Sequence, residues 1–138
     1  MNKYIDIAIK EAKKSLKTAD IPVGAVIVEN NKIIAKSHNT REKTQIITGH
    51  AEINVINKVA KQKNTWHLNN CELYVTLEPC KMCKSVIEQA KIKKVYYAAK
   101  NTSVLSSNEE KNNFSIEKIN DNGCSEQLVK NFFQKIRK

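Results

Sequence analysis

This chain of 138 residues has little of what would mark a specialised class of protein. It holds only 3 glycines and 2 prolines, so no stretch has the composition of a flexible linker between domains. No apolar run approaches the length needed to cross a bilayer, and the first residues are charged throughout, unlike a secretory signal. With 41% hydrophobic and 28% charged residues, the composition predicts one globular domain over residues 1–138, in the cytoplasm and without a membrane.

Arginine is also scarce: of the 24 basic residues only two are arginines, Arg41 and Arg137. The formal net charge is nevertheless +10, and an excess of this size favours a polyanionic partner such as nucleic acid. The chain is rich in lysine and asparagine, and a bias of that kind across a whole proteome produces the same charge without any function. The charge therefore supports a nucleic-acid partner and does not define one.

Hydrophobic periodicity predicts alternating helices and strands. Helical spacing covers residues 2–17, 50–62 and 127–137, and Pro79 suits the first turn of a further helix over about 80–90. Strand-like runs cover residues 23–29, 32–38, 71–77 and 94–99, and residues 114–119 predict a fifth strand. The order of these elements predicts a three-layer α/β/α sandwich around one mixed five-stranded sheet.

Local signals add detail to this outline. Asn30 and Asn31 predict a tight hairpin between the first two strands, because asparagine tolerates a positive φ. The sequence Asp-Ile-Pro at 20–22 ends the first helix, and residues 39–49 and 101–113 read as polar loops. In the first helix the expected buried stripe consists of Tyr4, Ala8, Ala12 and Leu16.

Two of the 4 cysteines, Cys80 and Cys83, lie three residues apart in the stretch TLEPCKMCKSV at 76–86. A disulfide, half of a structural metal site and two ligands of a catalytic metal all fit that spacing, and so does a thioredoxin-like redox pair. In the cytoplasm, thiols and metal ligands are favoured over a disulfide. A helix start places both sulfurs on one face and lowers thiol pKa values, which favours the thiolates that metals bind.

About thirty residues upstream, the stretch TGHAEINVI places His50 and Glu52 at the start of another predicted helix. One histidine and two cysteines form a nitrogen and sulfur ligand set that suits zinc. Three protein ligands leave a fourth position for water, as in catalytic zinc sites, whereas a structural site needs a fourth ligand. Four other residues are candidates for that fourth ligand: Cys71, Cys124, His38 and His67. Only Cys124 stays open, because the other three fit the position less well.

Glu52 follows the histidine by two residues, close to the open position of such a site. A carboxylate there accepts a proton from a water molecule whose pKa zinc lowers to about 7. The alternative role for Glu52 is that of an acidic residue that stabilises the N-terminus of the helix. The combination with His50, Pro79, Cys80 and Cys83 favours the catalytic role.

His-Ala-Glu at 50–52 followed by Pro-Cys-x-x-Cys at 79–83 is the signature of zinc-dependent nucleoside and nucleobase deaminases, which this chain resembles. Further stretches are similar to the bacterial tRNA-specific adenosine deaminases: IPVGAVIVENNKII (21–34), GHAEI (49–53), LYVTLEPCKMC (73–83) and NFFQKIRK (131–138). The resemblance implies a cytidine-deaminase-like fold, one zinc ion per subunit and a homodimer. It also implies conversion of adenosine to inosine at the wobble position of a tRNA anticodon stem-loop, expected in an arginine tRNA.

The same resemblance implies roles for individual residues. His50, Cys80 and Cys83 would hold zinc, and Glu52 would carry protons to the purine N1 and to the departing ammonia. Backbone N–H groups around Pro79 and Cys80 or at Ala51 would position the tetrahedral centre. The remaining substrate contacts would come from Asn39, which binds the extruded base, and from Phe132, Phe133 and Arg137, which support the anticodon loop. Asn39 is alternatively a turn former, and Phe133 is alternatively a core residue.

Two departures from that family pattern stand out. Asn101 occupies a place where the tRNA enzymes usually carry an aspartate, and asparagine accepts a hydrogen bond from a ribose 2′-hydroxyl without a negative charge. We therefore expect weaker discrimination between ribose and deoxyribose. Residues 46–49 read Ile-Ile-Thr-Gly where Asp-Pro-Thr-Ala is common, which predicts a differently shaped loop before His50.

Two other functions compete with tRNA deamination. A small-molecule deaminase that acts on guanine, cytosine or cytidine would share the same zinc residues. A zinc-stabilised nucleic-acid-binding module without catalysis is the second alternative. Glu52 argues against that module, because a purely structural site has no use for the carboxylate.

Overall fold

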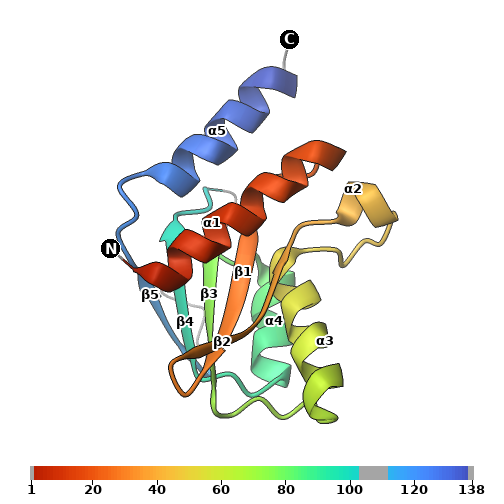
Figure 1. Ribbon diagram of the computed structural model, residues 1–138, viewed down its shortest axis with the longest axis vertical. Helices are drawn as coiled ribbons and strands as arrows, with labels where there is room; N and C mark the ends of the chain where they lie inside the picture. The colour runs from red at the N-terminus through yellow and green to blue at the C-terminus, as the bar shows by residue number, and fades with distance from the viewer. Residues whose placement is uncertain (1, 103–111, 137–138) are drawn as a thin grey trace.

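The structure is a computed structural model that describes residues 2–102 and 112–136. Its five strands are β1 (Gly24–Glu29), β2 (Lys32–His38), β3 (Cys71–Leu77), β4 (Lys94–Ala99) and β5 (Ser115–Lys118). They form one sheet in the order β2-β1-β3-β4-β5 (Figure 1). The β2/β1 and β1/β3 pairs are antiparallel, and the β3/β4 and β4/β5 pairs are parallel, so the predicted mixed five-stranded sheet is confirmed.

Helices cover both faces of the sheet. The main helices are α1 (Lys3–Ser15), α3 (Ala51–Lys63), α4 (Lys81–Gln89) and α5 (Cys124–Ile136), with a 3-10 turn at Leu16–Thr18 and a short α2 (Arg41–Thr44). Helix α1 packs on the face that carries Val26 and Val28, whereas α3 and α4 pack on the face that carries Ala25 and Ile27. Helix α5 contacts α1, β3 and β4 (Figure 1). The three-layer α/β/α sandwich is therefore confirmed.

Strand β1 lies at the centre of both cores. Its side chains alternate between the two faces, and residues 24–28 are all buried, which is expected for a strand covered on both sides. The hairpin to β2 turns at Asn30 and Asn31, whose φ values are +52° and +63°. Both values lie in the left-handed region that two-residue hairpin turns require, so the predicted tight hairpin is confirmed.

Helix α1 differs from its predicted stripe at one end. Ala8 and Ala12 are fully buried, but the side chain of Leu16 is 44% exposed. Two polar residues, Glu11 and Ser15, take buried places on that face. Glu11 accepts a hydrogen bond from Lys14 in the same helix and lies 3.1 Å from His38 Nδ1 in β2. Ser15 donates to the backbone oxygen of Asn39, just after β2. Periodicity alone misses such pairings.

Two element boundaries also differ from the prediction. The polar segment 39–49 contains the four-residue helix α2, and α5 begins at Cys124, three residues earlier than predicted. The predicted loop 101–113 lies largely outside the described residues. In the part of the chain that the structure describes, no helix is long and apolar enough to span a bilayer.

Candidate metal centre and active site

The site is formed where two helices begin. His50 is the residue that precedes α3, and Cys80 is the residue that precedes α4; both have extended backbone conformations, and neither side chain caps its own helix. Cys83 lies in the first turn of α4 and is fully buried. Helix α4 follows β3 directly, so it begins at the carboxyl end of the parallel pair β3 and β4. The start of α3 lies beside it, and open α/β sheets bind ligands at this end of their strands.

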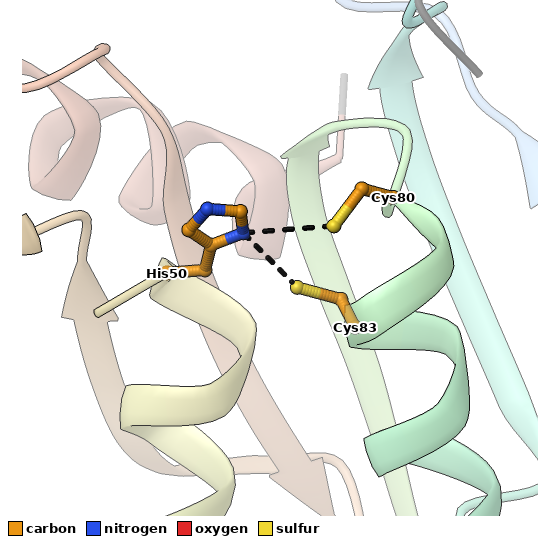
Figure 2. A group of neighbouring side chains, drawn as sticks. All are labelled: His50, Cys80 and Cys83. Carbon is orange, nitrogen blue, oxygen red and sulfur yellow. Dashed lines mark hydrogen bonds between the residues drawn. The ribbon is translucent and has the colours of Figure 1, made fainter. Parts of the chain in front are cut away.

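The three side chains converge on one point, as Figure 2 shows. His50 Nδ1 lies 3.3 Å from Cys83 Sγ and 3.7 Å from Cys80 Sγ. Zinc–sulfur and zinc–nitrogen bond lengths in a tetrahedral site place a histidine nitrogen and a cysteine sulfur about 3.6 Å apart. The observed distances lie on either side of that value, and all three ligand atoms lie within 4.8 Å of one another, so the donor set suits a tetrahedral zinc ion.

This is the one group of histidine, cysteine and acidic side chains among residues 2–102 and 112–136 that could hold a metal ion. The other candidate ligands lie elsewhere. Cys71 begins β3 and contacts Glu29, and His38 contacts Glu11. The prediction of three protein ligands instead of four agrees with this geometry, and Cys124 does not join the group.

Hydrogen bonding between the two cysteines sets their protonation. The Cys83 thiol donates to Cys80, and this bond, together with His50, lowers the pKa of Cys80 despite its partial burial. The same bond and burial raise the pKa of Cys83. The downward shift favours the thiolate at Cys80, the form in which a cysteine would bind a metal ion.

Glu52 lies in the first turn of α3 with only 4% of its surface exposed. Burial raises its pKa to about 7, although its own backbone amide, His50 and Cys83 act in the opposite direction. A carboxyl group with a pKa near neutrality both accepts and donates protons at neutral pH, which suits general acid–base chemistry. Glu52 lies beside Cys83, and its catalytic role stays a prediction.

The predicted substrate-binding residues divide into two sets. Asn39 is buried beside the metal group, and its Oδ1 accepts a hydrogen bond of 2.7 Å from the Ala51 backbone N–H. The Ala51 N–H is one of the two alternatives predicted to position the tetrahedral centre, and the other is the backbone around Pro79 and Cys80. Because the Ala51 N–H already donates to Asn39, the Pro79–Cys80 backbone becomes the better assignment.

A second set lies around a cavity of about 540 Å³ between α5 and the ends of β3 and β4. Asn101 and Phe133 line it, together with Ile21, Leu77 and Lys130. Asn101 also donates its backbone N–H to the Glu78 carboxylate, which ties this wall to the segment just before Pro79. Phe132 contacts Phe133 edge to face, with ring centroids 5.4 Å apart. Arg137 lies outside the described residues.

Sequence reasoning missed one residue at the metal group. Arg41, in α2, places its Nη2 atom 2.8 Å from His50 Nε2 and donates from Nε to the backbone oxygen of Ile47. Its only sequence signal is that it is one of two arginines in a lysine-rich chain. An arginine forms fixed, planar hydrogen bonds that a lysine cannot reproduce, so its selection here has a physical reason.

The sequence of this chain is similar to a known protein family and to curated proteins. A family model described as the cytidine and deoxycytidylate deaminase zinc-binding region matches residues 1–99. The tRNA-specific adenosine deaminase of Bacillus subtilis (strain 168) is 46% identical over 96 residues, which cover 70% of this chain and 60% of that protein. The chain thus spans less than two thirds of that curated relative.

Two solved structures are also similar. One comes from biochemical and structural studies of A-to-I editing by tRNA:A34 deaminases at the wobble position of transfer RNA. It is 30% identical to this chain, with a TM-score of 0.77. The match covers 84% of this chain and 96% of that one. A guanine deaminase from Bacillus subtilis is 28% identical with a TM-score of 0.68, and the match covers 99% of this chain and 94% of that one.

Proposed function

The chain belongs to the cytidine and deoxycytidylate deaminase family, and on that premise we propose that it hydrolyses adenosine to inosine at the wobble position of a tRNA anticodon. Water replaces the 6-amino group of the base, and ammonia leaves. The likeness to tRNA adenosine deaminases in sequence and in fold supports the choice of substrate. The observation that carries the chemistry is the convergence of His50, Cys80 and Cys83 beside the buried Glu52.

Each residue of the centre has a role in this reaction. His50, Cys80 and Cys83 hold one zinc ion per subunit. A zinc ion so held supplies Lewis-acid activation of water near neutral pH. Glu52 accepts one proton of the attacking water and delivers it to the purine N1. It then takes the remaining hydroxyl proton from the tetrahedral C6 and delivers it to the amino group, so that ammonia departs as the C6 carbonyl forms. General acid–base catalysis of this kind contributes about 10²–10⁴-fold to the rate.

Recognition of the substrate falls to residues around the centre. Asn39 contacts the extruded base through its amide, and the backbone at Pro79 and Cys80 positions the tetrahedral carbon. Ala51 contributes indirectly, because its N–H fixes the Asn39 side chain. A buried asparagine held from one side presents its other polar group in a fixed direction, which favours discrimination between bases.

The cavity beside α5 receives part of the anticodon loop. Its volume of about 540 Å³ lies in the range of ligand-binding sites. Phe133 offers an aromatic face to a neighbouring base and Lys130 a positive charge to a phosphate. Phe132, which contacts Phe133, and Arg137 are further proposed contacts of the loop. The net charge of +10 fits a polyanionic substrate.

Further properties follow from the tRNA assignment. The substrate is an arginine tRNA, the active form is a homodimer, and the protein acts in the cytoplasm as a single deaminase domain over residues 1–138. Asn101 in place of an acidic residue reduces discrimination against deoxyribose. If the RNA:DNA ratio of deamination rates is the same in wild type and Asn101→Asp, this role of Asn101 is wrong.

A second candidate function has an observation in its favour. The likeness to the guanine deaminase extends over 99% of the chain, and zinc chemistry alone does not distinguish a free base from a base in RNA. The two assignments differ in substrate. We therefore propose to offer zinc-loaded protein an anticodon stem-loop with the sequence ACG beside free adenosine, guanine and cytidine.

Inosine in the stem-loop alone supports the tRNA assignment. Turnover of a free base or nucleoside alone supports the small-molecule enzyme and leaves the zinc centre in place. If Glu52→Gln retains both zinc and RNA binding and the wild type turns over none of the substrates, the protein is a zinc-stabilised binding module.

A further inference from the structure

The short helix α2 is held at its N-terminus by a residue from a distant segment. Its own preceding residue, Thr40, makes no capping hydrogen bond with its side chain. Asp20, in the connection between the 3-10 turn and β1, accepts the backbone N–H of Glu42 at 2.6 Å and that of Lys43 at 3.3 Å. A carboxylate at this place satisfies N–H groups that a helix start leaves without partners and interacts favourably with the helix dipole.

Asp20 is itself fixed. Only 2% of its surface is exposed, and its Oδ2 accepts a hydrogen bond of 2.7 Å from the Thr18 hydroxyl. Ser15, fully buried at the end of α1, adds a second attachment five residues earlier by donating to the backbone oxygen of Asn39 at 2.9 Å. Two buried groups, one at the end of α1 and one just after it, therefore hold the beginning of the segment 39–50.

The rest of this segment has little packing of its own. Ile46 and Ile47 are 54% and 77% exposed, so their side chains do not anchor it in the core. A four-residue helix is also too short to be stable alone. The position of the segment must therefore depend on hydrogen bonds. Three of these attach residues 39–40 at its beginning, and their partners are Val23, Ala51 and Asn54. Among these contacts Asp20 alone binds the backbone of α2 from outside the segment.

The segment ends at His50. From α2, Arg41 contacts both the Ile47 backbone oxygen and His50 Nε2, and the Thr40 N–H donates to the Gly49 oxygen at 2.8 Å. Arginine only donates hydrogen bonds, whereas a neutral histidine that binds a metal through Nδ1 carries its proton on Nε2, so the backbone attachment just before His50 orients the ligand, and the Arg41 side chain does not. A continuous series of hydrogen bonds thus runs from Asp20 through α2 to the backbone of residues 47 and 49, directly before His50.

We propose that Asp20 and Ser15 are positioning residues for the metal centre. They fix the segment 39–50 so that His50 presents Nδ1 toward Cys80 and Cys83. The inference rests on the metal role proposed above for these three residues, and adds a specific cause for the affinity of the site.

The fold offers a matched control for this idea. Asp121 is 3% exposed and accepts the Ser125 N–H at 2.8 Å and the Gly123 N–H at 3.1 Å, so it caps α5 much as Asp20 caps α2. No hydrogen bond connects Asp121 to the metal group among the contacts of the described residues. Replacing either aspartate removes a buried cap, but only one of the two lies in the series that reaches His50.

The test measures zinc affinity by competition with a chromogenic chelator, together with urea unfolding of the same zinc-free proteins. We expect Asp20→Ala to bind zinc about tenfold more weakly than wild type, at the lower end of effects seen when partners of metal ligands are removed. Asp121→Ala should lose similar stability and keep wild-type zinc affinity. Asp20→Asn, which keeps one acceptor oxygen, should fall between Asp20→Ala and wild type.

Equal zinc affinity in Asp20→Ala and Asp121→Ala would overturn the proposal and leave Asp20 as a structural cap. If Asp20→Ala does not fold, Ser15→Ala provides the same comparison with a smaller change, and unaltered zinc affinity in it overturns the proposal as well. A wild-type protein that binds no zinc would instead contradict the proposed function, from which this inference starts.

Discussion

Gly24 is the residue whose replacement has the most direct geometric consequence. It begins β1 where α1 crosses the strand, and a Cβ atom there would lie 1.9 Å from the Ala8 backbone oxygen and 2.6 Å from the Ala12 nitrogen. Ordinary van der Waals contact begins at 3.4 Å, so α1 must retreat by about 1.5 Å in Gly24→Ala. Both obstacles are backbone atoms, and no change of side-chain rotamer relieves them.

The retreat separates α1 from a core that contains the fully buried Ile5 and Val28. Overpacking of a core typically costs about 1–3 kcal/mol, and we expect about 3 kcal/mol here because a whole helix moves. For a chain of this size, that corresponds to a fall in Tm of roughly 10 °C. Thermal and urea unfolding of wild type and Gly24→Ala measure the effect.

Gly123→Ala is the matched control. A Cβ at Gly123 meets no atom within 4 Å, but the φ of +79° lies in the left-handed region. We expect a cost of about 1 kcal/mol from that backbone strain alone. A loss of stability in Gly24→Ala no greater than that in Gly123→Ala would refute the close contact between α1 and β1.

Three further predictions concern charge, metal and substrate. Burial raises the pKa of Glu11, but hydrogen bonds from Lys14 and His38 outweigh it, so the net shift is downward. Glu11→Gln should therefore lower the free energy of unfolding at pH 7 by about 1.5–3 kcal/mol. The difference between wild type and variant should shrink as the pH falls below 4.5, where Glu11 takes up a proton. A difference independent of pH in urea titrations would contradict this. Removal of zinc with a chelator should lower the Tm of wild type and leave that of Cys83→Ser unchanged, because bound metal stabilises only the folded state. Phe133→Ala should raise the KM for the stem-loop about tenfold, the effect of losing one base–aromatic stack, with zinc content unchanged; an unaltered KM would place Phe133 outside the substrate contacts.

The elements predicted from the sequence are those with local causes. Strands β2, β3 and β4 have the predicted bounds, because alternation and turn residues within a few positions define them. The metal group was also predicted, since His50 and Glu52 share one helix start and Cys80 and Cys83 share another. What remained to be found was that two segments thirty residues apart place His50 Nδ1 3.3 Å from Cys83 Sγ and 3.7 Å from Cys80 Sγ.

The features that the sequence did not reveal depend on distant partners. Helix α2 exists because Asp20, more than twenty residues away, accepts its first N–H groups. Glu11 is buried because His38 faces it from β2, and no periodic pattern records that pairing. The contact of Arg41 with His50 likewise requires the fold of the intervening segment.

The central claim is that Glu52 transfers protons in a zinc-dependent deamination of adenosine within RNA. The most direct test is inosine formation in an ACG anticodon stem-loop by wild type, Glu52→Gln and the exposed control Glu117→Gln, each with its zinc content measured. Glu52→Gln should retain zinc and RNA binding but react about 10²–10⁴-fold more slowly, whereas Glu117→Gln should match wild type. A zinc-loaded Glu52→Gln that forms inosine at the wild-type rate would contradict the account.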